Sequence, residues 1–122
     1  MALDAVQVGA HVASQLGQIK QRELLDAITP LLVPPRCELR PWDYGSPEEA
    51  FPCWIVLEHA PSNTCIAYSE MGFGPRCPWR LLWTSGPSMN MGPDSSWYTY
   101  LEDAFRESFA REGQNPEGYE VR

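Results

Sequence analysis

Residues 51–70, FPCWIVLEHAPSNTCIAYSE, decide the fold expected for this chain. The first half of this stretch is apolar at both alternating positions, which is typical of a strand covered on both faces. Residues 60–63 then interrupt it with proline and short polar side chains, which favour a turn. A partly alternating run follows at 64–70. The pattern predicts a β-hairpin with a short loop.

The loop of this hairpin also predicts a register. A two-residue loop centred on Pro61 and Ser62 would place Cys65 opposite Glu58, and Cys53 opposite Glu70. Because side chains alternate between the faces of a sheet, the two cysteines are then expected on opposite faces. That arrangement disfavours a disulfide between them.

Further strands are expected on both sides of the hairpin. Residues 79–84 form a third strand after a loop rich in glycine and proline, and its two tryptophans, four positions apart, share one face. Residues 37–40 alternate between apolar and charged side chains, which is typical of a short strand. Because a proline follows at position 41, this strand is expected at an edge of the sheet.

Helices are expected near both ends of the chain. Between Leu3 and Thr29 two apolar stripes lie out of phase around Gly17, so either two helices meet there or one long helix changes its buried face. Pro30 ends the helical segment. A second helix is expected from about Ser96 to Arg111, capped by Asp94 or Ser95. The segment 113–122 is expected to fray or to form a short edge segment.

Strands grouped between helices predict an α+β fold with an antiparallel sheet of three to four strands. The hairpin 51–70 and the strand 79–84 form its centre, and the N-terminal helical segment and the C-terminal helix pack on it. With 122 residues and 14 aromatic side chains, the sequence is expected to form a single domain, 1–122.

The balance of acidic and basic side chains indicates which classes of molecule this protein can bind. Nine basic against 16 acidic side chains give a net charge of −7, and the basic residues are scattered, so a nucleic-acid partner is not expected. Residues 94–122 carry seven acidic and three basic groups and therefore contribute −4 of that total. An acidic surface of this kind favours a basic protein partner.

The sequence predicts a cytoplasmic protein without a membrane segment. No basic residue precedes Lys20, as a secretory signal would require, and no apolar stretch approaches the ~20 residues of a membrane helix. Four cysteines at positions 37, 53, 65 and 77 include no C-x-x-C pair, so neither a metal site nor a cofactor is expected. They are interpreted as reduced thiols that pack as small apolar side chains.

No catalytic residues are predicted. The G-x-S-x-G motif of serine hydrolases does not occur, and Cys53 and Cys65 are not placed where a helix N-terminus would activate a thiol. Glu58 and His59 are neighbours on a strand and face opposite ways, so at most one of them can join Glu70 as an acid–base pair.

The leading functional hypothesis is a non-catalytic protein-binding module, such as a stoichiometric inhibitor. Bacterial immunity proteins, which neutralise a toxin domain, share this composition, although the analogy is one of composition alone. The partner-binding candidates lie in the loop after the hairpin and on the C-terminal helix: Phe73, Arg76, Trp79, Asp94, Glu102, Asp103 and Glu107. Tryptophan beside proline and glycine also commonly fills core space, and both alternatives stay open.

The alternative hypothesis is a small-molecule-binding domain or minor enzyme. Its pocket would lie between the sheet and the helices and would be lined by Trp54, Glu58, Tyr68 and Trp83. A purely structural subunit of a larger assembly is a third possibility, and it predicts self-association.

Overall fold

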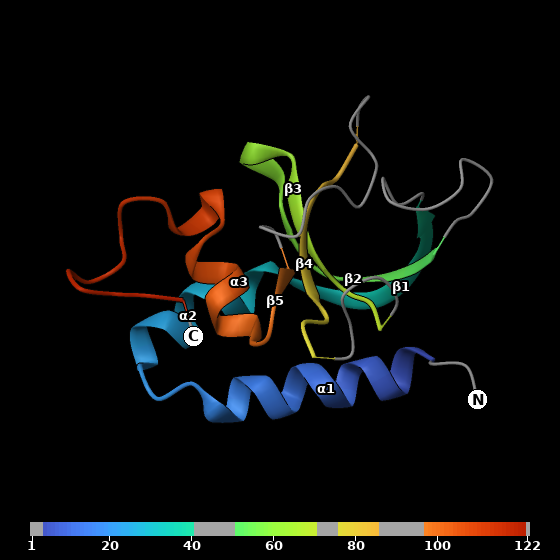
Figure 1. The fold of residues 1–122 in the computed structure, drawn as a ribbon, viewed down its shortest axis with the longest axis horizontal. Coiled ribbons are helices and arrows are strands. Elements are labelled where there is room, and N and C mark those ends of the chain that lie inside the picture. The colour runs from blue at the N-terminus through green and yellow to red at the C-terminus, as the bar shows by residue number, and fades with distance from the viewer. Residues whose placement is uncertain (1–3, 41–50, 71–75, 86–96, 122) are drawn as a thin grey trace.

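The computed structural model describes residues 4–40, 51–70, 76–85 and 97–121, with Phe51 described by its backbone alone. These residues form a five-stranded antiparallel sheet in the order β1-β2-β3-β4-β5, with the helices gathered on one face (Figure 1). The α+β class is confirmed. The number of strands is five rather than the three to four expected.

The elements follow one another as a helical segment, a meander of strands and a second helical segment. The helices are α1 (Ala5–Gln18), α2 (Arg22–Ile28) and α3 (Leu101–Arg106), with short 3₁₀ turns η1 (Thr29–Leu31), η2 (Ala60–Ser62) and η4 (Phe109–Arg111). The strands are β1 (Leu32–Arg40), β2 (Phe51–His59), β3 (Thr64–Tyr68), β4 (Trp79–Trp83) and β5 (Trp97–Tyr98).

Two helices, rather than one, occupy the N-terminal segment. The backbone N–H of Gln7 donates to Asp4 Oδ1 at 2.9 Å, and the Asp4 N–H donates to Gln7 Oε1 at 3.0 Å, so a reciprocal capping box begins α1. The helix ends where Ile19 turns into extended backbone. The change of phase around Gly17 therefore marks the approach to a break between helices, and Pro30 lies in the turn that follows α2.

The C-terminal helix begins later than its sequence predicts. Trp97 and Tyr98 form β5, which pairs with Trp79 and Arg80 of β4 and supplies the fifth strand. Aromatic side chains and threonine favour strand over helix in the run WYTY at 97–100. Helix α3 then begins at Leu101. The expected caps, Asp94 and Ser95, lie outside the described residues.

The central hairpin has the predicted pairing at one end but not at the other. Glu58 lies opposite Cys65, as expected, whereas the register shifts between Ile55 and Leu57. A bulge of this kind inserts one residue into one strand and reverses the alternation beyond it. Cys53 and Cys65 consequently belong to the same buried cluster on one face, and the prediction that they face opposite ways is wrong.

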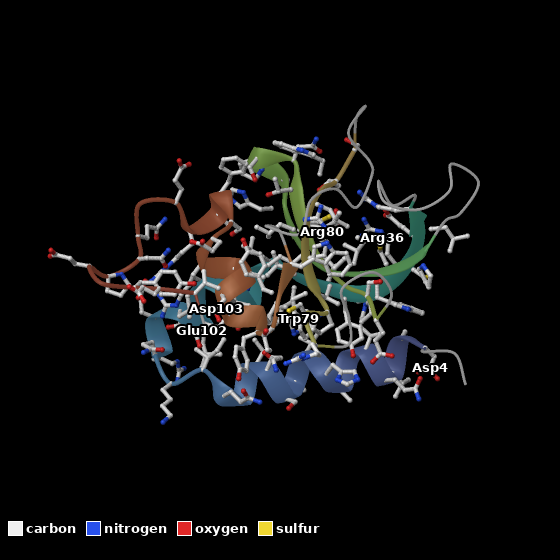
Figure 2. The ribbon with its side chains drawn as sticks, in the orientation of Figure 1. Asp4, Arg36, Trp79, Arg80, Glu102 and Asp103 are labelled. Atoms are coloured by element: carbon white, nitrogen blue, oxygen red, sulfur yellow. The ribbon has the colours of Figure 1, made fainter. Side chains whose placement is uncertain are left out.

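The sheet buries a cluster on each face. The larger core lies beneath the helices, where Val8 and Val12 of α1 and Leu24 and Ile28 of α2 pack with Trp79 and other sheet residues. The smaller cluster lies on the opposite face and comes from the strands: Cys53, Ile55, Cys65, Ala67, Leu82 and Trp97. Trp79 lies between the sheet and α1 in Figure 2. The centre of the sheet is therefore buried on both faces, whereas the edge strand β1 is partly exposed along most of its length.

A buried arginine links two distant corners of the sheet. Arg40 ends β1, yet its Nη1 donates to the carbonyl of Trp83, which ends β4, at 2.7 Å. Register irregularities in β1 and β2 allow strong bending, and both strands curve in Figure 1. We infer that this curvature brings the two corners together. Glu38 Oε1 completes the contact by accepting from Arg40 Nη2 at 2.7 Å.

Candidate functional site

The predicted partner-binding residues around the loop after the hairpin fall into different environments. Trp79 is 2% exposed and contacts Tyr68 edge-on with ring centroids 5.0 Å apart, so it belongs to the core rather than to a surface. Arg76 is exposed. Phe73 and Asp94 lie outside the described residues. Of the two alternatives left open for Trp79, the structure favours core packing over display on a surface.

The acidic residues of α3 are also separated by their surroundings. Glu102 accepts from Arg106 Nε at 2.9 Å and is mostly buried. Asp103 is 1% exposed and accepts from the hydroxyl of Tyr119 at 2.9 Å. Glu107, at the end of the helix, is exposed. The three carboxylates therefore do not form one open patch, and Glu107 is the member that a partner can reach directly.

The C-terminal segment packs back onto α3 and does not have the frayed form expected from its composition. Asn115 Nδ2 donates to the Arg106 carbonyl at 2.6 Å, and the Arg106 guanidinium lies over the Tyr119 ring at 5.3 Å from its centroid. Arg111 donates two hydrogen bonds to the Glu23 carboxylate, at 2.6 and 3.1 Å. These contacts bury the guanidinium groups of both arginines.

Replacing Tyr119 with phenylalanine tests this packing. Burial and the hydrogen bond to Asp103 raise the pKa of the Tyr119 hydroxyl, so it remains a donor at neutral pH. Tyr119→Phe removes a donor from a buried carboxylate and is expected to lower the free energy of unfolding by about 1.5–3 kcal/mol. Urea unfolding measures the loss, and amide hydrogen exchange should accelerate across 112–121. Unchanged stability and exchange would contradict the assignment.

The exposed acidic character of the C-terminal region lies mostly in residues that the sequence did not single out, with Glu107 as the exception. Within 97–121, both basic side chains, Arg106 and Arg111, are buried, while four glutamates are exposed: Glu107, Glu112, Glu117 and Glu120. We call these four the acidic C-terminal surface. The excess of acid was visible in the sequence, but which charges reach the solvent depends on the fold of the C-terminal segment.

A polar groove of about 500 Å³ adjoins this surface. Its walls come from α3, from the connection between α1 and α2, and from the C-terminal segment, and they include Asp103, Arg106, Glu117 and Glu120. Figure 2 shows Glu102 and Asp103 close together on α3. The groove can admit a polar or charged side chain, and its shape depends on the contacts that hold Tyr119.

The four residues expected to line a small-molecule pocket do not all come together. Tyr68 is buried and stacks on His11 of α1, with ring centroids 4.7 Å apart. Glu58 lies on the opposite face of the sheet, where its Oε1 accepts from Arg36 Nη1 at 2.6 Å. Trp54 is half-buried against the larger core, and Trp83 is partly exposed at the end of β4. Trp54 and Tyr68 are cross-strand partners at the larger core, whereas Glu58 and Trp83 lie apart from them.

The buried thiols are poorly suited to nucleophilic chemistry. Burial raises the pKa of Cys53 to about 12 and also raises the pKa of Cys65, so both remain protonated at neutral pH. Across the described ranges, no group of three or more histidine, cysteine or acidic side chains is arranged to hold a metal ion.

No helix within those ranges has both the length and the apolar character needed to cross a membrane. Comparisons with protein-family models, with curated proteins and with solved structures find no match to this chain.

Proposed function

We propose that this protein is a non-catalytic binding module that engages a basic region of a partner protein through the acidic C-terminal surface. It acts in the cytoplasm and in a fixed ratio to its partner, as an inhibitor or immunity-type protein does. The polar groove beside Glu117 and Glu120 receives a side chain of that partner. Charge attraction brings the partner to the surface, and direct contacts at the surface give the binding its specificity.

The observation that carries the proposal is the asymmetry of exposed charge. Between residues 97 and 121 the cations are turned inward and paired, whereas four glutamates face the solvent. Lys20 is exposed on the wall of the groove beside Glu117 and Glu120, but the exposed carboxylates outnumber it. Such an excess of exposed negative charge creates a potential that accelerates encounter with a basic surface. A chain that only needed solubility would not require its arginines to be buried beneath that surface.

Two further observations fit this proposal. The acidic surface is supported by a fixed framework, because Arg111 is bound to Glu23 of α2 and Tyr119 to Asp103 of α3. Less ordering entropy is then lost on binding. All four cysteines are free thiols, which is typical of proteins in a reducing compartment such as the cytoplasm.

Charge neutralisation tests the proposal directly. The wild-type protein and the double variant Glu107→Gln/Glu117→Gln are immobilised, and proteins captured from a lysate are compared. We expect a basic protein that binds the wild type in a fixed ratio. After its purification, calorimetry should show affinity weakened by roughly 3- to 10-fold in the variant. Binding should also weaken as salt is raised.

A matched variant controls for net charge alone. Asp26→Asn/Glu70→Gln removes the same two negative charges from positions outside the acidic C-terminal surface, and the amide oxygen introduced at position 70 would still accept the Tyr68 hydrogen bond. Its affinity should stay close to that of the wild type. Capture that is identical for both double variants, or independent of salt, would overturn the proposal.

A further inference from the structure

Two aromatic side chains from distant parts of the chain form an exposed pair. Trp83 at the end of β4 is 43% exposed, and Phe109 at the start of η4 is 53% exposed. Their ring centroids lie 6.1 Å apart with an interplanar angle of 33°. A cluster of exposed aromatic side chains indicates a contact site more strongly than a single exposed apolar residue does.

The backbone beneath Trp83 is fixed on both sides. Trp83 lies opposite Thr64 of β3, and the N–H of Thr84 donates to the Asn63 carbonyl at 2.8 Å. The carbonyl of Trp83 accepts from the buried Arg40. An exposed tryptophan on such a rigid support loses little conformational freedom when a partner covers it.

Phe109 is supported in a comparable way by residues on either side of it. The hydroxyl of Ser108 donates to the Phe105 carbonyl at 2.6 Å, and the backbone N–H of Arg111 donates to the Ser108 carbonyl at 3.1 Å. The ion pair between Arg111 and Glu23 attaches η4 to α2. The turn is held in place while the phenyl ring remains exposed.

Acidic side chains stand on both sides of the turn that carries Phe109. Glu107 and Glu112 stand two residues before and three residues after Phe109, and both are exposed. Aromatic faces and carboxylates together fit a cation with a flat apolar surface. The net charge of −7 disfavours a second copy of this chain, or a nucleic acid, as the occupant.

We propose that the Trp83–Phe109 pair is the anchor point for an arginine side chain of a basic protein segment, with Glu107 and Glu112 pairing its charge. This inference rests on the proposed function and names the contact that gives it specificity. Arginine is favoured over lysine because its planar guanidinium stacks on aromatic rings and donates to carboxylates at the same time, whereas an ammonium group is a strongly hydrated point charge.

The test uses two peptides of equal charge, nona-arginine and nona-lysine, titrated into the intact protein at physiological ionic strength. Binding is followed by calorimetry and by the ¹H–¹⁵N spectrum, in which the indole signal of Trp83 is assigned from the Trp83→Ala variant. We expect nona-arginine to bind about 3- to 5-fold more tightly than nona-lysine. The Trp83 indole signal should shift most with nona-arginine.

Substitutions distinguish the contribution of aromatic stacking to peptide binding from that of charge. Trp83→Ala and Phe109→Ala, each checked for folding by circular dichroism, should bring the two peptides to equal affinity. Glu107→Gln/Glu112→Gln should weaken both peptides by a similar factor and keep the preference for arginine. Leu39→Ala is the control for an exposed apolar residue elsewhere, since Leu39 is 69% exposed, and it should change neither affinity.

The outcomes distinguish the anchor from the broader function. Equal binding of the two peptides to the wild type, or a preference that survives both aromatic substitutions, overturns the anchor and leaves the acidic surface as the binding feature. Failure of both peptides to bind overturns both proposals. Concentration-dependent self-association that Trp83→Ala abolishes would identify a second copy as the occupant and likewise overturn the anchor.

Discussion

The variant Trp79→Ala is expected to lower the free energy of unfolding by about 3–5 kcal/mol, as large-to-small aromatic substitutions in a core do. Trp79 is among the largest fully buried side chains, and it packs in the main core with Tyr68, which in turn stacks on His11. Its removal deletes apolar contacts and leaves a cavity between the sheet and α1. Urea unfolding followed by far-UV circular dichroism measures the effect.

Trp83 is the matched control that shows whether Trp79 belongs to the core. Both tryptophans belong to β4, but Trp83 is partly exposed, so Trp83→Ala should cost less than about 1 kcal/mol. If Trp79 were a contact residue on an open surface, the two substitutions would have similarly small effects on stability. Equal and small losses would therefore show that Trp79 is not part of the core.

Replacing Arg40 with alanine should have an effect of similar size, about 3–5 kcal/mol, because breaking a buried ion pair leaves its other polar groups without their partner. Arg40 is 1% exposed and bonds to Glu38 and to the carbonyl of Trp83. Its loss would separate the corners of the sheet at the ends of β1 and β4. Chemical unfolding measures the loss, and Arg36→Ala serves as the control, since Arg36 is exposed and should matter far less.

The pH dependence of stability reports on the same contact. Burial acts to raise the pKa of Glu38, but hydrogen bonds and charge attraction from Arg40 and Arg36 outweigh it and hold that pKa below the usual 4.5. Glu38 therefore binds a proton more readily in the unfolded chain than in the folded one. Its contribution is present above pH 4.5 and is lost as pH falls through the lower folded value.

The variant Glu38→Gln isolates this effect. It lacks the carboxylate at every pH, so its deficit relative to the wild type should be largest near neutrality and should narrow as pH falls below 4.5. A deficit that stayed constant across this range would mean that the ion pair does not contribute as described.

The parts of the fold that the sequence predicts well are those with strong local patterns. The hairpin 51–70 is recognisable because its apolar runs are separated by a clear turn, and the phase change near Gly17 marks the gap between α1 and α2. The start of α3 differs from its prediction because Trp97 continues the apolar face of the predicted helix, although the residue types at 97–100 favour a strand. Pairing with β4, a contact distant in sequence, decides between them.

The sequence predicts that the candidate site is negatively charged, but it does not predict which residues form the site. Counting charges locates an acidic C-terminal region, yet Asp103 is buried, and the count does not distinguish the exposed Glu112, Glu117 and Glu120. The difference arises because residues 112–121 fold back on α3 and cover Arg106. Similarly, the exposed Trp83–Phe109 pair joins two segments distant in the sequence, and no local periodicity reports such a meeting.

The bulge in β2 divides that strand into two segments in which the side chains alternate in opposite order. Before it, odd-numbered residues such as Cys53 and Ile55 face the smaller cluster, whereas beyond it that face belongs to the even-numbered Glu58. Val56 is the extra residue, since its neighbours Ile55 and Leu57 pair with adjacent residues of β3. Deleting Val56 would therefore restore a regular alternation in which the remaining side chains keep their faces, and only the Val56 side chain would be lost from the larger core. Whether a residue number is odd or even is therefore no guide to the face of this strand, and the effect of a substitution depends on which side of the bulge it lies.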